Sequence, residues 1–317
     1  MATTDLTSKF TLLDVQKMTD PKGRLTKVAT ILTQSNDPLK DATWEMCNNG
    51  NVHEYGEETY LGEAYYGAIN EGWGEGKSET EQRIARASEY VLDSRVDIKL
   101  IKGNAIGQQT RHFKDKRIIE GIGQQMQYDM LYGDGLGKHP EGLFTKFNSL
   151  SLPNVINNGG SGTDLRSLFI VQWGIDKVTL LYPEGTTAGL MMEDQGIKDV
   201  WNGDLRMEKY VTKFQAHMGV AVKDARCFQR IVNIEPQGDN YSLNAAKIVE
   251  ALNNMPERGK GAVIYCDRSL MTQFDILAME KNNVTYESDE VWGGKVAHFQ
   301  GTPVRMCEQL VDESTIS

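Results

Sequence analysis

The sequence predicts an α+β protein in which a projecting hairpin and one long helix precede a mixed part of strands and helices. Three observations support this prediction. Residues 43–102 contain two polar, tyrosine-bearing arms around a glycine-rich stretch, and residues 104–132 keep apolar side chains at helical spacing. From residue 168 onward, short apolar runs with strand character alternate with amphipathic helical segments. Patterns of this kind are typical of a mixed core of helices and sheets.

The composition is that of a globular, acidic protein. The chain has 317 residues, 39% hydrophobic and 25% charged, which allows one large or two ordinary domains with a sizeable core. Its formal net charge of −10 argues against a protein whose main task is to grip DNA, since such proteins carry a basic face. The first residues lack the pattern of a signal peptide, and no apolar run approaches 18 residues. We therefore expect no membrane-spanning segment.

The first 102 residues predict an arm and then a hairpin. Residues 1–42 hold two short helical segments with too few apolar side chains for a core of their own. In residues 43–102, the tip NEGWGEGKSETEQ separates an outgoing arm from a return arm, where Val96, Ile98 and Leu100 alternate with charges as in a strand. Long exposed strand edges promote aggregation unless a partner covers them. The hairpin therefore predicts a standing contact with neighbouring subunits.

A single long helix is predicted over residues 104–132. Ile118, Ile122, Met126 and Met130 recur at i+4 spacing along one face, with charged and glutamine residues elsewhere. A helix of this length spans roughly 43 Å. We expect it to end at the glycine-rich sequence GDGLGK that follows.

The remaining chain predicts several strands and two helices. We expect two strands within 168–183, a polar glycine-marked loop over 185–205, and two further strands within 206–236. The predicted helices cover 243–252 and 269–281, the second with Ser269 as its N-cap. GAVIYCD predicts a buried strand, and VAHFQGTPVRMCEQL predicts two strands joined by a turn.

The sequence GEGKS within the hairpin tip has the ending of a phosphate-binding loop. That loop requires glycine five residues before Gly76, where this chain has Glu71, and Glu75 adds a second negative charge where an anion would lie. The residues after Lys77 are polar up to Ile84 and do not suggest the helix that should follow. We therefore interpret GEGKS as a solvated, flexible loop and keep a nucleotide-binding enzyme only as a remote alternative.

Other chemical signatures are weak throughout the chain. The five histidines lie in unrelated segments, the four cysteines are far apart, and neither set has metal-ligand spacing. Cysteine usage of this kind fits a reducing cytoplasm. The cluster Met191–Asp194 supplies too few oxygens for a cation site, and we interpret it as a solvated loop. The sequence predicts no catalytic residue, no cofactor and no metal site, and therefore no enzyme.

Three blocks of sequence suggest a family. They are FIVQWGIDKVTLLYPEGTTAGLMMED at 169–194, GVAVKDARCFQRIVNIE at 219–235 and GKVAHFQGTPVRMCEQL at 294–310. Together with the order of the parts, they resemble the major capsid proteins of tailed bacteriophages with the HK97 fold, and in particular the gp7-like group of podovirus-type phages. The likeness covers about residues 10–312; it is specific within 169–235 and loose in the hairpin.

The resemblance implies a division of the chain into five parts. They are an N-terminal arm (1–42), an extended loop hairpin (43–102), a peripheral domain with a long spine helix (103–150 and 165–236), an axial α/β domain (237–300), and a closing strand with the C-terminus (301–317).

The resemblance also implies a function. A major capsid protein would self-assemble into hexamers and pentamers of the icosahedral phage head and enclose double-stranded DNA without binding it specifically. It would be assembled in the host cytoplasm and found in the virion. The implied partners are further copies of the chain, a scaffolding protein, a portal and a decoration protein. Some relatives crosslink their subunits through Lys and Asn side chains, but we find no matching site. An encapsulin-like nanocompartment shell and, less well, a tail-tube subunit remain alternatives.

The subunit interface is expected on the hairpin and its return arm. The candidate contact residues are Trp73, Lys77, Arg83, Arg86 and Tyr90. In an assembly these side chains should be more buried than in the free subunit.

Overall fold

The chain is described here from a computed structural model. It describes residues 37–317 except 61, 65, 68, 71, 73, 103–106, 187, 203–204, 238–240, 281–283 and 289–294. The helices predicted within the first 36 residues lie outside these described residues. The described part falls into two compact units, of which the first contains Glu89–Met126 and Gly189–His217. The second contains Ser35–Ser88, Gln127–Ala188 and Met218–Ser317.

A seven-stranded mixed sheet forms the centre of the second unit, in the order β12-β13-β14-β11-β6-β10-β5. Its strands are β5 (Val155–Asn157), β6 (Arg166–Gln172), β10 (Phe228–Ile234), β11 (Ala262–Cys266), β12 (Val284–Ser288), β13 (Lys295–Phe299) and β14 (Thr302–Met306). β6 is buried almost along its whole length, because side chains of both its faces are covered. This explains its continuous apolar run, where a strand with one solvated face would alternate.

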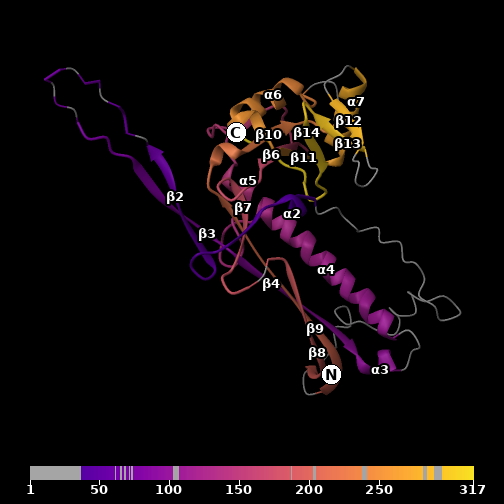
Figure 1. Cartoon of the computed structure of the whole chain (residues 1–317). Helices are drawn as coiled ribbons and strands as arrows, with labels where there is room; N and C mark the ends of the chain where they lie inside the picture. The colour runs from indigo at the N-terminus through magenta and orange to yellow at the C-terminus, as the bar shows by residue number, and fades with distance from the viewer. Residues whose placement is uncertain are drawn as a thin grey trace. The chain divides into compact units, whose positions relative to one another are not determined.

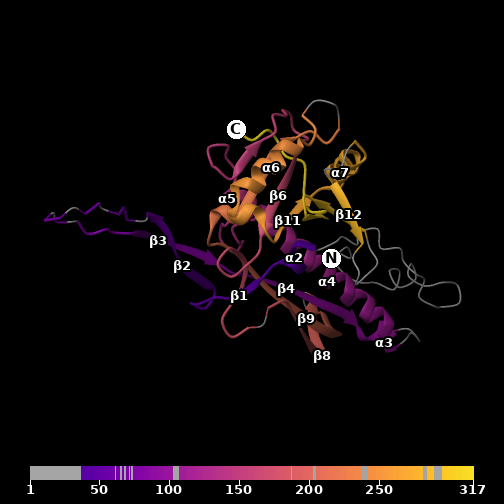
Figure 2. The ribbon, with the colours of Figure 1, turned by 45° about the horizontal axis from the view of Figure 1, so that its top comes forward.

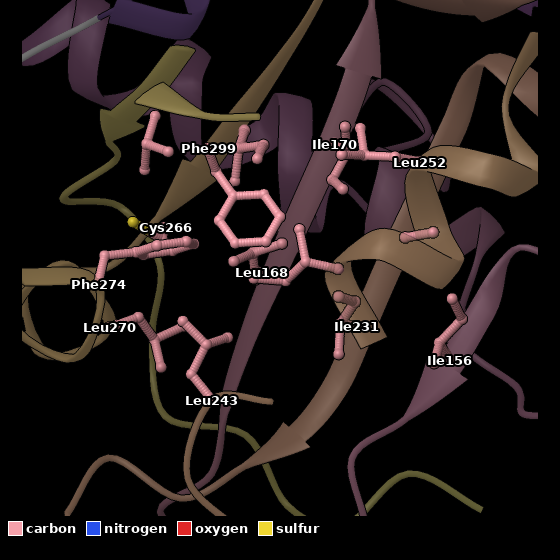
Figure 3. Close-up of a cluster of buried hydrophobic side chains, with 14 of the residues drawn as sticks. Ile156, Leu168, Ile170, Ile231, Leu243, Leu252, Cys266, Leu270, Phe274 and Phe299 are labelled. Atoms are coloured by element: carbon pink, nitrogen blue, oxygen red, sulfur yellow. The ribbon is translucent and has the colours of Figure 1, made fainter. Parts of the chain in front are cut away.

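One face of this sheet packs against helices α6 (Ala245–Asn254) and α7 (Arg268–Glu280). Figure 3 shows Leu168, Phe274 and Phe299 meeting between the strands and the helices, within one cluster of buried side chains. Both helices were predicted from their apolar faces, and the structure confirms them within a few residues. The predicted cap of α7 is wrong: Asp267 precedes the helix and accepts hydrogen bonds from the backbone N–H and the hydroxyl of Ser269.

The other face of the sheet carries aromatic side chains and a buried ion pair. Phe169 meets Phe144 of the short helix α5 (Leu143–Lys146) edge to face and stacks with Tyr265. Arg230 is 2% exposed; its guanidinium lies 2.8 Å from the Glu313 carboxylate and 3.9 Å from the Phe144 ring centre. It also donates to the Phe147 carbonyl at 2.8 Å. These contacts fix the last residues of the chain to the core.

The second unit also contains the short helix α2 (Asp37–Asp41) and a second group of strands. Strand β1 (Trp44–Met46) pairs in parallel with β7 (Val178–Tyr182), and β7 pairs with the end of β9 (Leu205–Val222). Asp41 anchors α2, because it accepts a hydrogen bond from the Tyr265 hydroxyl at 2.6 Å and pairs with Arg305 at 2.5 Å.

In the first unit, β4 (Ser88–Asp97) and β8 (Leu190–Asn202) flank the beginning of β9. The long helix α4 (Gly107–Tyr132) has its residues up to Met126 in this unit. Arg111 ties α4 to the strands: it forms an ion pair with Asp194 at 2.6 Å and donates to the Thr212 hydroxyl at 2.8 Å. The single long helix predicted from the sequence is therefore confirmed over its described residues.

The end of α4 lies where the glycine-rich sequence predicted it. A side chain at Gly133 would place a Cβ atom 2.1 Å from the Pro140 carbonyl oxygen and 2.6 Å from that of Asp129. Only glycine fits such a close approach of two backbone segments.

Two further predictions of local structure are wrong. Residues 185–205, expected as a loop, contain the thirteen-residue strand β8, and Gly196, one of the glycines that suggested a loop, lies in its bulge. β8 is an exposed strand whose apolar and polar residues do not alternate cleanly, so its sequence hides its pairing. The strand expected through Leu100 ends at Asp97, whose carboxylate accepts from the Lys99 backbone N–H and starts the short helix α3 (Ile98–Lys102).

Candidate functional site

The candidate site is a two-stranded hairpin formed by β2 (Val52–Tyr60) and β3 (Glu79–Arg86) in the second unit. The strands pair antiparallel from Val52 opposite Arg86 to Tyr60 opposite Glu79, with a bulge near Tyr60. Figures 1 and 2 show the two strands side by side along their whole length. The residues between Tyr60 and Glu79 form the tip. The return arm is thus divided: β3 closes the hairpin, whereas β4 pairs with β9.

The base of the hairpin is anchored by a small apolar cluster and by close backbone packing. Ala85 and Ala87 are buried against Cys47, Leu181 and Ala221. The Tyr55 hydroxyl donates to the Val222 carbonyl at 3.0 Å. A Cβ atom at Gly219 would lie 2.4 Å from the Arg86 carbonyl oxygen, so β9 and the hairpin base approach too closely for any side chain at this position. The base is therefore held in one position by sterics as well as by hydrogen bonds.

A buried histidine lies in the same region. His53, the second residue of β2, is 6% exposed, and its Nε2 lies 3.9 Å from Glu45, which is paired with Lys223 at 2.7 Å. Burial lowers the pKa of His53 below its ordinary value of 6.5; the Glu45 carboxylate opposes this and Lys223 adds to it. The imidazole is therefore neutral near neutral pH, and acid must force a charge into a buried place.

A network of side-chain hydrogen bonds lies at the exposed side of the hairpin base. Asn48 accepts from the Glu54 backbone N–H at 2.9 Å and donates to its carbonyl at 2.7 Å. The Glu54 carboxylate in turn accepts from Asn49 at 3.2 Å and from Gln82 on β3 at 3.0 Å. These hydrogen bonds hold the first residues of β2 in place.

Beyond the base, the hairpin exposes large apolar side chains. Tyr66 and Ile69 are almost completely exposed, and Tyr60 and Ile84 are about half exposed. Ala85 is the one described residue of β3 that is buried. Isolated apolar residues are common on protein surfaces, and here four exposed ones lie on a single hairpin.

The structure places four of the five predicted interface residues. Lys77 is exposed in the tip, Arg83 lies on β3 in an exposed ion pair with Glu81 at 3.0 Å, and Arg86 is exposed at the end of β3. Tyr90 is half-buried on β4 in the first unit and so is not part of the hairpin. Trp73 lies outside the described residues.

The geometry of GEGKS does not suit phosphate binding. The residues after Ser78 form strand β3, whereas a phosphate-binding loop leads into a helix whose N-terminus faces the anion. The five residues 74–78 are exposed and connect the two strands. This part of the chain is therefore a hairpin tip.

Sequence reasoning missed the side chains that make the hairpin a plausible binding surface. Tyr60, Tyr66, Ile69 and Ile84 were not among the predicted contact residues, although they are large side chains with apolar parts among glutamates and glycines. The acidic residues Glu79 and Glu81, both exposed on β3, were also missed. The density of glutamate in this stretch was the available signal.

Other kinds of site were sought in the described part of the chain. Within those residues, no three His, Cys, Asp or Glu side chains gather as the ligands of a metal ion would. The four cysteines are buried as free thiols, and burial raises the pKa of Cys47 and Cys227 to about 11. None of the described helices combines the length and the apolar character needed to cross a bilayer.

Comparison with known proteins identifies the family. The family described as major capsid protein GP7 matches residues 20–316. The chain is similar to a solved structure of bacteriophage Epsilon15, with a TM-score of 0.72 and 24% identity over 96% of this chain and 97% of that one. It is also similar to the bacteriophage JBD30 capsid, with a TM-score of 0.54 and 10% identity over 88% and 93% of the two chains. No curated protein sequence matches it. The chain therefore belongs to the major capsid protein GP7 family and has the HK97-like fold of phage capsid subunits.

Proposed function

We propose that this major capsid protein assembles into the hexamers and pentamers of an icosahedral phage head, and that the β2–β3 hairpin is a contact between neighbouring subunits. The observation that carries the proposal is the exposure of Tyr60, Tyr66, Ile69 and Ile84 on an element with almost no core of its own. The family assignment favours a phage capsid over a nanocompartment shell.

The hairpin is suited to a contact role because its base is rigid and its far end is exposed. The Gly219 approach and the Tyr55 hydrogen bond fix the base, so the direction of the strands is set before assembly. Binding then requires little ordering of the β2–β3 ladder, which preserves affinity. We propose that Trp73, Lys77, Arg83 and Arg86 lose solvent exposure when the hairpin meets a neighbour, and that Tyr90 on β4 lies at the same interface.

The charge of the chain supports a role around packed DNA. Each chain has a net charge of −10, so the shell would enclose the nucleic acid without binding it tightly. Tight binding needs many lysine and arginine contacts to phosphates. The head would assemble in the host cytoplasm and persist in the virion.

The proposed domain roles follow the family. Residues 103–150 and 165–236 would form the peripheral domain with α4 as its spine helix, and residues 237–300 the axial domain at capsomer centres. A scaffolding protein, a portal and a decoration protein are the proposed partners. Without a scaffolding protein we expect a mixture of aberrant assemblies; uniform closed shells from this chain alone would contradict that partner.

Deletion of residues 72–78, which include Lys77, tests whether the tip contributes to the contact. The deletion shortens the tip and leaves β2 and β3 intact, so the subunit should stay folded while the yield of closed shells falls. Shell yield is counted by electron microscopy and sedimentation velocity, and folding is checked by circular dichroism. A matched control replaces the same seven residues by a glycine-serine linker of equal length, which separates loop length from side-chain contacts. Normal shells from the deletion variant would show that the tip makes no essential contact.

A further inference from the structure

We infer that a basic patch on helices α3 and α4 contacts the phosphate backbone of the DNA that the head encloses. The inference rests on the proposed function and names the surface of the subunit that meets the nucleic acid. Residues 98–117, from the start of α3 into α4, hold six lysines and arginines against one aspartate, a net charge of +5. The rest of the chain therefore has a net charge of −15. This segment is a local reversal of charge in an acidic protein.

Four of these six cations are exposed to solvent: Lys99 and Lys102 on α3, and Lys116 and Arg117 on α4. We call these four residues the basic patch. Among the described residues, none of the four forms an ion pair with a carboxylate. The other two cations are engaged within the chain, and the single aspartate, Asp115, is buried. The exposed charge of the segment is therefore positive.

The acidic residues around the patch do not cancel its charge. Asp93 pairs with Arg95 at 2.8 Å, and Asp97 accepts a hydrogen bond from the Lys99 backbone N–H. Within the described chain, one carboxylate oxygen of Glu120 is buried without a hydrogen-bond partner. When these neighbours are counted, residues 93–120 still hold seven lysines and arginines against four acidic residues, a net charge of +3.

The two helices bring the patch together at one end of the first unit. The Lys114 ammonium on α4 donates to the Arg95 carbonyl oxygen at 2.7 Å, and β4 runs from Arg95 directly into α3. Figures 1 and 2 both show α3 beside the first turns of α4. Lys99 and Lys102 are three residues apart on one helix and therefore lie on the same face. The four cations thus belong to one region of the surface.

Helix stability does not account for this placement of charge. The N-terminal end of a helix carries the positive end of its dipole, where acidic residues are stabilising and cations are not. α4 has no acidic residue in its first turn, and the first one along the helix is the buried Asp115. Cations gathered near this end add to the positive potential, which favours an anionic ligand.

A phosphate backbone fits cations that have no fixed partners. Duplex DNA carries one negative charge for about every 1.7 Å of its axis, so it reaches several cations wherever it crosses the patch. Lysine ammonium groups act as point charges on flexible stems. The Arg117 guanidinium lies 4.8 Å from the centre of the Phe113 ring, a cation–π contact that supports it from within the helix. Contacts to phosphates do not depend on the base sequence.

The acidic remainder of the chain is compatible with this contact. Charges more than about 10 Å apart are largely screened at 0.1 M salt, so the patch acts through its local charge. Four phosphate contacts give weak binding, with a slope of about −3.6 when the logarithm of the association constant is plotted against that of the salt concentration. Each subunit therefore touches the DNA without holding it tightly.

A salt titration of the full-length subunit tests the patch. Fluorescence anisotropy follows binding to a labelled DNA duplex between about 50 and about 200 mM salt. K99Q/K102Q/K116Q removes three contacts, so the slope should become shallower by about 2.7. Over this range of salt, the unaltered chain should lose about 40-fold more affinity than the variant. Thermal unfolding shows whether the variant is still folded.

A matched control separates the patch from the overall charge. K138Q/R258Q/K260Q also removes three exposed cations, so it lowers the net charge from −10 to −13 just as the patch variant does. The control should keep the slope of the unaltered chain. An equal loss of slope in both variants would overturn the inference, and so would a lack of salt-dependent binding by the unaltered chain.

Poly-L-glutamate in the same titration tests for an acidic protein as the ligand. An extended polypeptide carries one charge for about every 3.4 Å, half the density of duplex DNA. The unaltered chain should therefore bind poly-L-glutamate more weakly than DNA. If the patch variant loses affinity for poly-L-glutamate and keeps its affinity for DNA, the patch receives an acidic protein and the inference is overturned.

Lysine footprinting of assembled heads locates the contact. Lys99, Lys102 and Lys116 should react more slowly with an amine-acetylating reagent in DNA-filled heads than in empty shells, because phosphates shield their ammonium groups. Lys260, an exposed lysine outside the patch, should react equally fast in both. Equal rates at the three patch lysines would place the DNA on another surface and overturn the inference.

The outcomes separate this inference from the proposed function. The titration uses free subunits and gives its answer whether or not shells form. If the patch variant binds DNA like the unaltered chain while both form closed shells, the inference fails and the proposed assembly stands. If the unaltered chain forms no shells even with a scaffolding protein, the proposed assembly fails, and the slopes still decide whether the patch binds DNA.

Discussion

Replacement of Gly219 by alanine should misdirect the β2–β3 hairpin. The added Cβ atom would lie 2.4 Å from the Arg86 carbonyl oxygen and 2.9 Å from the Ala87 Cα atom. Ordinary contacts begin near 3.4 Å, so the hairpin base and β9 must separate by about 1 Å. Overpacking of this kind costs about 1–3 kcal/mol in the free energy of unfolding. A displacement of about 1 Å over one strand spacing of ~4.8 Å tilts the hairpin. Over the ~27 Å length of β3, this tilt moves the far end of the strand by about 6 Å.

The assay measures stability and assembly separately. We expect urea denaturation of the G219A subunit to show the loss of about 1–3 kcal/mol, and electron microscopy to show far fewer closed shells. The control is G121A, because Gly121 lies in α4 with no neighbouring atom within 4 Å of the added Cβ. If G219A unfolds like the unaltered chain and assembles at its normal yield, the base is not held by this close approach and the reasoning is refuted.

Three further predictions concern the subunit itself. R230M should lower the free energy of unfolding by about 3–5 kcal/mol in urea, because it leaves the Glu313 carboxylate buried without its cation; a loss below about 1 kcal/mol would contradict this. Stability should fall as the pH drops below 6.5, because burial lowers the pKa of His53 and of His217 and the unfolded chain therefore binds more protons there; H53Q should remove the part of this pH dependence that comes from His53, and an unchanged profile would exclude His53 as a source. G121A should raise the free energy of unfolding by about 0.5–1 kcal/mol through helix propensity alone; a measured decrease would mean that α4 needs this glycine.

The sequence allowed the helices and buried strands to be predicted because their side chains are sorted by burial. α6 and α7 each present an apolar face to the sheet, and β6 is apolar throughout because both of its faces are covered. The end of α4 was also predictable, since the glycines after Tyr132 permit a backbone approach that no other residue allows. In these places the local pattern and the tertiary contacts agree.

Exposed strands could not be predicted in the same way. β8 is held by backbone pairing with β9, and its exposed side chains mix apolar and polar residues without a clean alternation, so its sequence does not mark it as a strand. The hairpin was recognisable from its glycine-rich tip, but the pairing of Glu57 with Glu81 and of Lys198 with Lys209 depends on register. Register is set by bulges and turn geometry, which a single sequence does not reveal. The sequence therefore assigned the candidate interface to the hairpin, while the register that brings these charged residues together emerged only from the structure.

The measurement that tests the central claim most directly is cryo-electron microscopy of the particles formed by the full-length chain. The account predicts closed shells of hexamers and pentamers in which Tyr60, Tyr66 and Ile84 of each hairpin are covered by a neighbouring subunit. Shells in which these side chains remain exposed to solvent would contradict the role of the hairpin. A stable monomer that forms no shells, even with a scaffolding protein, would contradict the proposed assembly itself.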